Sequence, residues 1–312
     1  MKIAIIGANG MLSIALTKYF YAQPDITVDV YGLEAPNGYE CTNFYKVNLL
    51  TDRLNYPQLI SADVIVYASG AGVQAALKTD SSLMYALNVN VPIEITLQLK
   101  KLGYSGKFIS FGSYMEIGLN DEDGRAFTEE EVVCSTLPVT NDYGLSKRLY
   151  SRYMQDFIAD FSFYHFILPN MFSEDDLKPG TRLVPYVLKY LQDYTAGRPT
   201  ESQMYSPGTQ TRQYITLEEV MIVLSKAIEK NIPSGLYCIG GGEFFSIRNL
   251  IERLYALYGV PCKDEYFGKS VRRDGDIKSL RIDGRKLEAV IGYLPNTSVE
   301  ELFKPQNVGR NV

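Results

Sequence analysis

Short apolar runs alternate with longer helical patterns through the first half of the chain. β-Branched and other apolar runs predict strands, and a helical spacing of apolar residues predicts the segments between them. The predicted strands are Lys2–Ile6, Ile26–Tyr31, Asp63–Tyr67, Lys107–Phe111 and Phe161–Leu168, and the predicted helices are Met11–Tyr21, Leu83–Leu102 and Tyr143–Ala159. This alternation predicts an α/β fold, a Rossmann-like, doubly wound parallel sheet with helices on both faces.

The second half of the chain has a different pattern. Past about Asn170 the sequence becomes irregular, with proline and glycine at Pro179, Gly180, Pro199 and Pro207. The 312 residues also exceed the usual size of one compact core. We therefore expect a Rossmann domain at residues 1–170. Residues 171–312 are expected to form mainly a smaller C-terminal lobe that closes over a ligand, with some segments returning to the sheet.

Composition narrows the possible partners and the location. The net charge of −5 leaves no broad basic surface, so we expect no binding to nucleic acid or to a membrane. Four cysteines without Cys-x-x-Cys spacing, and a single histidine, argue against a metal site or a disulfide framework. That histidine, His165, lies in an apolar run, where we expect a packed core residue. The N-terminal apolar run is too short for a signal peptide and none in the sequence would span a bilayer, so we predict a cytoplasmic protein.

A glycine turn follows the first predicted strand. Gly7 and Gly10 stand where a tight turn lets backbone N–H groups approach a pyrophosphate, with Asn9 and Met11 beside them. The N-terminus of the following helix carries a partial positive charge, which also favours an anion. Ser13 stands where a third glycine is common and is small enough for close helix–strand packing. The segment therefore predicts a dinucleotide site.

The end of the second predicted strand indicates which dinucleotide binds. Glu34 would accept hydrogen bonds from the adenosine ribose hydroxyls and would repel a 2′-phosphate, and no Lys or Arg follows before Lys46. We therefore predict NAD as the cofactor, with NADP as the less favoured alternative. Asp29 is a rival for this role, although strand alternation would place it on the opposite side from Val28 and Val30.

Tyr143 and Lys147 are four residues apart in a predicted helix, a spacing that places the phenol beside the ammonium group. Among the 24 tyrosines, only Tyr143 has a lysine four residues further on. A nearby cation stabilises a phenolate, so we expect Lys147 to lower the pKa of Tyr143 from its usual value of about 10 toward neutrality. The pair predicts a general acid/base.

With these features in place, the sequence resembles the extended short-chain dehydrogenases/reductases, specifically the nucleotide-sugar epimerases, dehydratases and reductases. The segment Phe108-Ile-Ser-Phe-Gly-Ser-Tyr-Met-Glu-Ile-Gly118 resembles the strand end that carries the catalytic Ser or Thr of that family. Asp63-Val-Ile-Val-Tyr-Ala-Ser-Gly70 resembles the strand that lies along the cofactor. The resemblance implies a catalytic set of Ser113, Tyr143 and Lys147.

The resemblance also implies residues for both ligands. Besides the glycine turn, Glu34 and the Tyr–Lys pair, the expected cofactor residues are Asn48, Leu49, Ala68, Ser69, Gly70, Asn88 and Pro169. The expected residues for a nucleotide-sugar substrate are Ser113, Tyr114, Asn170, Arg182, Arg212 and Arg272. The planar guanidinium groups among them suit bidentate phosphate binding.

Departures from the family pattern bear on the reaction. The resemblance places the second acid/base pair of 4,6-dehydratases at Tyr114 and Met115, neither of which is a base at neutral pH. Glu116 is one residue late, and we expect it to point elsewhere. We therefore predict an NAD(P)-dependent oxidoreductase acting at C4 of a nucleotide-activated sugar. The NAD preference indicated by Glu34 favours a 4-epimerase. The unusual Gly112 before Ser113 keeps open a 4-ketoreductase for deoxysugars of surface polysaccharides, and a non-catalytic dinucleotide-sensing module is a remote alternative.

A homodimer is a further implication of the resemblance. In the family, helices corresponding to Leu83–Leu102 and Tyr143–Ala159 pack across a two-fold axis. The apolar residues expected in this interface are Leu83, Ile95, Leu99, Leu149, Tyr153 and Phe157.

Overall fold

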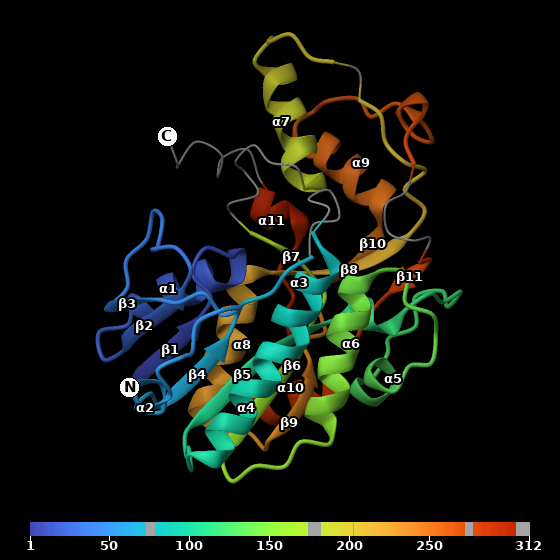
Figure 1. The fold of residues 1–312 in the computed structure, drawn as a ribbon. Helices are drawn as coiled ribbons and strands as arrows, with labels where there is room; N and C mark the ends of the chain where they lie inside the picture. Colours follow the sequence, from blue (N-terminus) through green and yellow to red (C-terminus); the bar gives the residue numbers. More distant parts are fainter. Residues whose placement is uncertain (73–78, 174–181, 202, 272–276, 304–312) are drawn as a thin grey trace.

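A seven-stranded parallel sheet forms the centre of the computed structural model, which describes all residues except 73–78, 174–181, 202, 272–276 and 304–312 (Figure 1). The strand order is β3-β2-β1-β4-β5-β6-β9, and all neighbouring strands are parallel. The strands are β1 (Lys2–Ile6), β2 (Thr27–Gly32), β3 (Asn43–Lys46), β4 (Val64–Tyr67), β5 (Lys107–Ser113), β6 (Ser162–Leu168) and β9 (Gly235–Cys238). The predicted Rossmann-like sheet is confirmed. Its order reverses direction between β1 and β4, where doubly wound sheets bind their ligands.

Helices cover both faces of this sheet. On one face lie α1 (Met11–Tyr21), α8 (Leu217–Lys230) and α10 (Arg285–Ile291). On the other lie α2 (Tyr56–Leu59), α4 (Val91–Lys101), α5 (Glu129–Val133) and α6 (Asp142–Gln155). Because both faces are buried, the strands are nearly continuous apolar runs, and these runs are the signal that predicts them.

A second, four-stranded sheet organises the smaller C-terminal part. Its central strand β8 (Thr211–Thr216) pairs in parallel with β7 (Asn170–Phe172) and β11 (Ser279–Leu280), and antiparallel with β10 (Glu243–Ser246). The helices α7 (Leu183–Thr195), α9 (Ile247–Leu257) and α11 (Val299–Phe303) surround a separate apolar core on this sheet (Figure 1). The chain also returns to the main sheet, because β9, α8 and α10 all come after β7.

Some elements differ from the predicted ones. The predicted helix Leu83–Leu102 consists of α3 (Ser81–Tyr85), a π-helix (Ala86–Asn90) and α4. Pro92, early in α4, has no N–H to donate to the carbonyl four residues back, which accounts for a wider turn here. The strand β3 and the 3₁₀ helices Tyr114–Ile117 and Asp264–Tyr266 have no predicted counterpart. No helix in the described part of the chain is long and apolar enough to cross a membrane.

Candidate active site

Ser113, Tyr143 and Lys147 come together at the carboxyl end of β5. Ser113 is the last residue of β5, and α6 begins one residue before Tyr143. The Lys147 Nζ donates a hydrogen bond to the Phe111 carbonyl oxygen at 2.9 Å, which fixes α6 against the strand. The Ser113 hydroxyl is hydrogen-bonded to the Tyr143 phenol. The tertiary structure thus places the three predicted catalytic side chains side by side.

The protonation of this pair differs from the prediction. Burial raises the pKa of Tyr143 to about 12, although the hydrogen bond from Ser113 acts in the opposite direction. Burial also lowers the pKa of Lys147 to about 8. The expectation that Lys147 brings the pKa of Tyr143 toward neutrality is therefore wrong. The loss of water around the phenol and the charge of Glu116 both raise this pKa, and Ser113 lowers it only in part.

The glycine turn is shaped by close backbone contact. Gly7 has a φ of +124°, and a Cβ there would lie 3.0 Å from the Ser69 backbone nitrogen and the Ala68 carbonyl carbon. Only glycine fits this position, so β1 and β4 approach each other closely at their carboxyl ends. Ser13 is buried, and its Oγ accepts from the Gly10 N–H at 3.1 Å, which agrees with the predicted packing role. The first turn of α1, which begins at Met11, carries no acidic side chain and so can face an anion.

The loop after β2 is tied to this turn. The Asn9 side-chain amide donates to the Ala35 carbonyl at 3.1 Å, and its Oδ1 accepts from the Asn37 N–H at 3.2 Å. The Glu34 side chain in this loop is exposed. The rival Asp29 is excluded, because its buried carboxylate accepts from the Asn43 amide at 2.7 Å and forms an ion pair with Lys2.

Asn88 joins the loop after β4 to α6. Its Oδ1 accepts from the Ala71 N–H at 3.0 Å, and its Nδ2 donates to the Ser146 hydroxyl at 2.9 Å. A Cβ on Gly70 would lie 3.0 Å from the Asn88 Oδ1 and 3.9 Å from the Lys147 Nζ. The cofactor residues predicted along β4 therefore meet the catalytic helix at one place.

Three further predicted cofactor residues are less exposed to a ligand. The Asn48 Oδ1 accepts from the Leu50 N–H at 3.1 Å, so this side chain closes its own turn after β3. Leu49 is partly buried against the apolar core, and Pro169 is buried between β6 and β7. Their contact with a cofactor remains a prediction.

The predicted substrate residues are spread over both sheets. Asn170 begins β7 and is half-buried, whereas Tyr114 is buried in the core beneath the strand end. Arg182, at the start of α7, contacts Met11 Sδ at 3.0 Å and donates to the Met171 carbonyl at 2.6 Å. It therefore links the C-terminal lobe to the glycine turn.

The two other predicted arginines occupy different situations. Arg212 is buried, and its guanidinium donates to the carbonyl oxygens of Thr211 at 2.7 Å and Ile277 at 2.9 Å. These bonds tie β8 to the segment before β11. Arg272 lies outside the described residues. A role of either arginine at a phosphate stays a prediction.

Glu116, which we expect to point elsewhere, is a buried residue of this site. Its Oε1 accepts from the Ser113 N–H at 2.6 Å, and its side chain is fully buried, so that expectation is confirmed. The Ser-x-x-Glu spacing from Ser113 to Glu116 is the capping-box signal, which could have placed the side chain. No group of three or more His, Cys, Asp or Glu side chains suited to a metal ion occurs among the described residues.

The Rossmann-like parallel sheet is the fold that the resemblance to the short-chain dehydrogenases/reductases implied. The NAD dependent epimerase/dehydratase family matches residues 3–240, so the chain belongs to that family. The predicted cofactor, NAD, is the one in the family's description. No curated protein sequence matches the chain.

Solved structures with this fold cover nearly the whole chain at low identity. MoeE5 in complex with UDP-glucuronic acid and NAD has a TM-score of 0.76 at 19% identity, with 99% of each chain covered. The dTDP-glucose 4,6-dehydratase of Bacillus anthracis, in complex with NAD, has a TM-score of 0.75 at 15% identity, covering 99% of this chain and 95% of that one. The UDP-glucuronic acid 4-epimerase of Bacillus cereus has a TM-score of 0.74 at 20% identity, with 99% of each chain covered. Such likeness establishes the fold alone.

Proposed function

We propose that the protein is an NAD-dependent 4-epimerase, which oxidises and then re-reduces C4 of a nucleotide-activated sugar. The observation that carries this proposal is the convergence of Ser113, Tyr143 and Lys147 beside the glycine turn. The close approach of Gly7 to Ser69 and the loop held by Asn9 form a backbone cradle suited to a dinucleotide. When bound there, NAD supplies the hydride acceptor and a positive charge.

Each catalytic side chain has a distinct task. The Tyr143 phenol exchanges a proton with the sugar hydroxyl that becomes the carbonyl. Ser113, which is hydrogen-bonded to that phenol, holds the same oxygen in place. With a pKa raised to about 12, Tyr143 is protonated at neutral pH and needs nearby positive charge to act as a base. Lys147, whose pKa is lowered to about 8, is still largely charged at pH 7 and provides part of that charge.

The position of Glu116 argues against 4,6-dehydration. That reaction needs a second acid/base group at a neighbouring carbon. The carboxyl group of Glu116 is fully buried and accepts from the Ser113 N–H, so it lies behind the strand end. Tyr114 and Met115 stand in the places where the family resemblance expects that group. A ketoreductase that uses fresh reduced cofactor remains the second candidate, because it needs the same three side chains.

Labelled substrates separate these reactions. We would denature the freshly purified protein and identify the released nucleotides by mass spectrometry. We would then incubate the native protein with UDP-glucose, UDP-glucuronic acid and dTDP-glucose carrying deuterium at C4. A 4-epimerase releases stoichiometric NAD and interconverts the 4-epimers with deuterium retained. Release of NADP contradicts the assignment of Glu34, and formation of a 4-keto-6-deoxysugar contradicts the proposal.

The variant Tyr143→Phe tests the acid/base assignment. Loss of the hydroxyl removes proton transfer, so turnover should fall by roughly 10²- to 10⁴-fold. The ring is retained, so the cofactor released on denaturation should stay stoichiometric. Tyr153→Phe, on the same helix but farther from Ser113, is the control and should keep wild-type turnover. Equal turnover in both variants excludes Tyr143 as the acid/base, and supports the sensing module.

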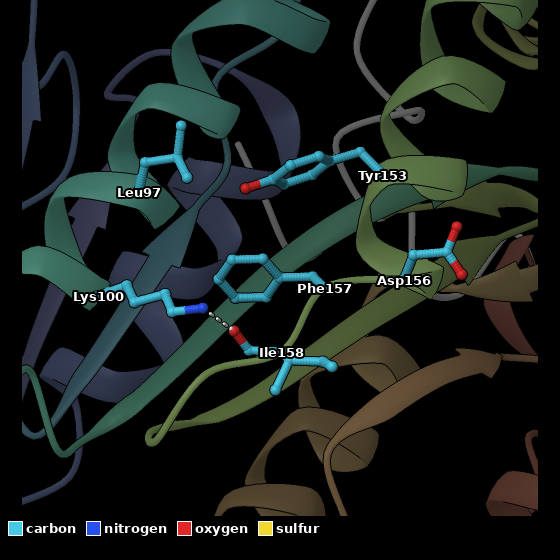
Figure 2. A pocket seen from close by; sticks show the side chains of 6 residues that line it. All are labelled: Leu97, Lys100, Tyr153, Asp156, Phe157 and Ile158. Atoms are coloured by element: carbon cyan, nitrogen blue, oxygen red, sulfur yellow. Dashed lines mark hydrogen bonds between the residues drawn. The ribbon is translucent and has the colours of Figure 1, made fainter.

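We further propose that the protein forms a homodimer through α4 and α6. A groove between these helices is lined by Leu97, Lys100, Tyr153, Asp156, Phe157 and Ile158, at the opposite end of α6 from Tyr143 (Figure 2). Leu97 and Ile158 of this groove are exposed, as is Leu149 on α6, which supports a partner on this face. Two of the residues expected in the interface, Ile95 and Leu99, are instead core residues buried within the subunit, whereas the largely buried Phe157 also lines the groove.

A further inference from the structure

Three polar side chains converge on Gly112, directly behind the catalytic serine. A Cβ at Gly112 would lie 2.5 Å from Glu116 Oε1, 2.9 Å from His165 Nε2 and 3.0 Å from Ser151 Oγ. These atoms come from the 3₁₀ helix after β5, from β6 and from α6. Because Gly112 has no side chain, a buried polar cluster fits against β5 at this position.

Glu116 does more than close the 3₁₀ helix. Glu131 and Glu219 hold the same capping position after Thr128 and Thr216. Glu131 is exposed and pairs with Arg125, and the two oxygens of Glu219 accept from the backbone N–H groups of Thr216, Asn296 and Thr297.

Only one oxygen of the Glu116 carboxyl accepts a backbone hydrogen bond, from Ser113. The buried Oε2 has no hydrogen-bond partner among the described residues. Since one oxygen suffices for the cap, the burial of the second oxygen is not explained by capping.

A chain of polar side chains leads away from this carboxyl group. The Ser151 hydroxyl lies close to the Glu116 carboxyl group and favours its charged form, and it lies 2.8 Å from His165 Nε2. The other ring nitrogen, Nδ1, lies 2.9 Å from the Ser110 hydroxyl. Burial lowers the pKa of His165 to about 3, so the ring is neutral and carries one proton.

A Ser151 hydroxyl shared between Glu116 and His165 would couple the tautomer of the ring to the proton of Glu116. When Glu116 is ionised, Ser151 donates to it, Nε2–H donates to Ser151, and Ser110 donates to Nδ1. When Glu116 is protonated, it donates to Ser151, Ser151 donates to Nε2, and Nδ1–H donates to Ser110. The second arrangement contains one proton more, which is the proton on Glu116.

We propose that Glu116 is a positioning residue for the reaction. It holds the backbone of Ser113, and the gain or loss of its own proton controls when Tyr143 and Lys147 exchange their protons. This inference rests on the proposed function, because it concerns the same catalytic set. Through this chain, the His165 ring, which is not a catalytic residue, reports whether Glu116 is protonated.

Several titratable groups surround Glu116. They are Tyr143, Lys147, Arg148 and Tyr150 of α6, His165 of β6, Glu129 of α5 and Cys238 of β9. Burial raises the pKa of Glu116 to about 7, although the Ser113 N–H, Ser151, Lys147 and Arg148 favour the charged form. The charge of Glu116 in turn raises the pKa of Lys147 and of Tyr143.

The first experiment uses the single histidine of the chain. Full-length protein labelled with ¹⁵N-histidine gives one imidazole spin system, recorded from about pH 5.5 to about pH 8.5. In the wild-type protein the ring nitrogens should exchange tautomer with a midpoint near pH 7 while the ring stays neutral. In Glu116→Gln this transition should be absent. A wild-type ring without a transition in this range overturns the proposal, whether or not the protein turns over a sugar.

The second experiment separates the charge of Glu116 from its structural role. The Glu116→Gln variant keeps an oxygen for the Ser113 N–H but cannot ionise at this position, so both limbs of the pH–kcat profile should move to lower pH by about one unit. The exposed cap variant Glu131→Gln should leave the profile in place. A Glu116→Gln profile that is scaled down without moving shows a merely structural role and overturns the proposal. If none of the three nucleotide sugars is turned over, the proposed function fails, and the histidine titration still decides the role of Glu116.

Discussion

At the scale of single residues, Gly112 shows how an absent side chain can shape a site. Its φ does not require glycine, yet a Cβ would collide with Glu116 Oε1 and His165 Nε2. The glycine that looks unusual before Ser113 is therefore explained by space in the interior. The absence of a side chain leaves room for the Glu116 carboxyl group directly behind Ser113.

Burial of Glu116 has a consequence for stability. Its pKa rises from 4.5 to about 7 on folding, so between these values the native state binds more protons than the unfolded state. The free energy of unfolding therefore falls as the pH rises through this window. At about 1.36 kcal/mol for each pKa unit, the wild-type free energy of unfolding should fall by about 3 kcal/mol relative to that of Glu116→Gln.

Urea unfolding measures this difference. Wild type and Glu116→Gln should be compared at about pH 5 and about pH 8, with the exposed Glu131→Gln as control. From about pH 5 to about pH 8, the free energy of unfolding of Glu116→Gln should rise relative to that of the wild type. That of Glu131→Gln should not. A difference between wild type and Glu116→Gln that is the same at both pH values would contradict the raised pKa.

At the scale of elements, the π-helix Ala86–Asn90 decides where Asn88 points. A regular helix was predicted across this segment, and the wider turn before Pro92 is not visible in an apolar periodicity. The turn buries Asn88, which then links Ala71 of the loop after β4 to Ser146 of α6. The family position of this residue could be predicted, but its hydrogen-bond partners required the folded chain.

Replacing Asn88 by Ala tests this link. The change leaves buried polar groups without their partners, so the free energy of unfolding should fall by roughly 2 to 4 kcal/mol, and less NAD should be retained. Asn90→Ala, on the exposed side of the same π-helix, should change stability by less than about 0.5 kcal/mol. Both are measured by urea unfolding and by nucleotide release. Equal effects of the two variants would exclude a special role for Asn88.

At the scale of the whole molecule, two sheets share one chain, and the main sheet receives strands from both halves. The strand β9 pairs with β6, while β7 follows β6 directly and pairs with β8 in the second sheet. The carboxyl ends of β1, β4 and β5 therefore face a region bordered by the C-terminal lobe, where Arg182 contacts Met11. The predicted division at residue 170 falls at the start of β7.

The proposed dimer is testable at this scale. Leu149 on α6 is 42% exposed, and placing a charge there should disrupt an apolar interface. In size exclusion with light scattering, the wild-type protein should have about twice the chain mass of 35.1 kDa. The Leu149→Glu variant should have about the mass of a single chain. Met204→Glu, at an apolar site on the C-terminal lobe that is 60% exposed, should remain dimeric. A wild-type particle of single-chain mass would refute the dimer.

The sequence by itself determined the α/β class, the parallel sheet, the glycine turn and the Tyr143–Lys147 pair. Each of these depends on residues close together in the chain, so periodicity and spacing reveal them. Tertiary structure alone decided the raised pKa of Tyr143 and the cluster behind Gly112. The cluster depends on Ser110 and His165, which are paired across β5 and β6, and on Ser151 of α6. Burial and contacts between distant segments determine these features, and no local pattern encodes them.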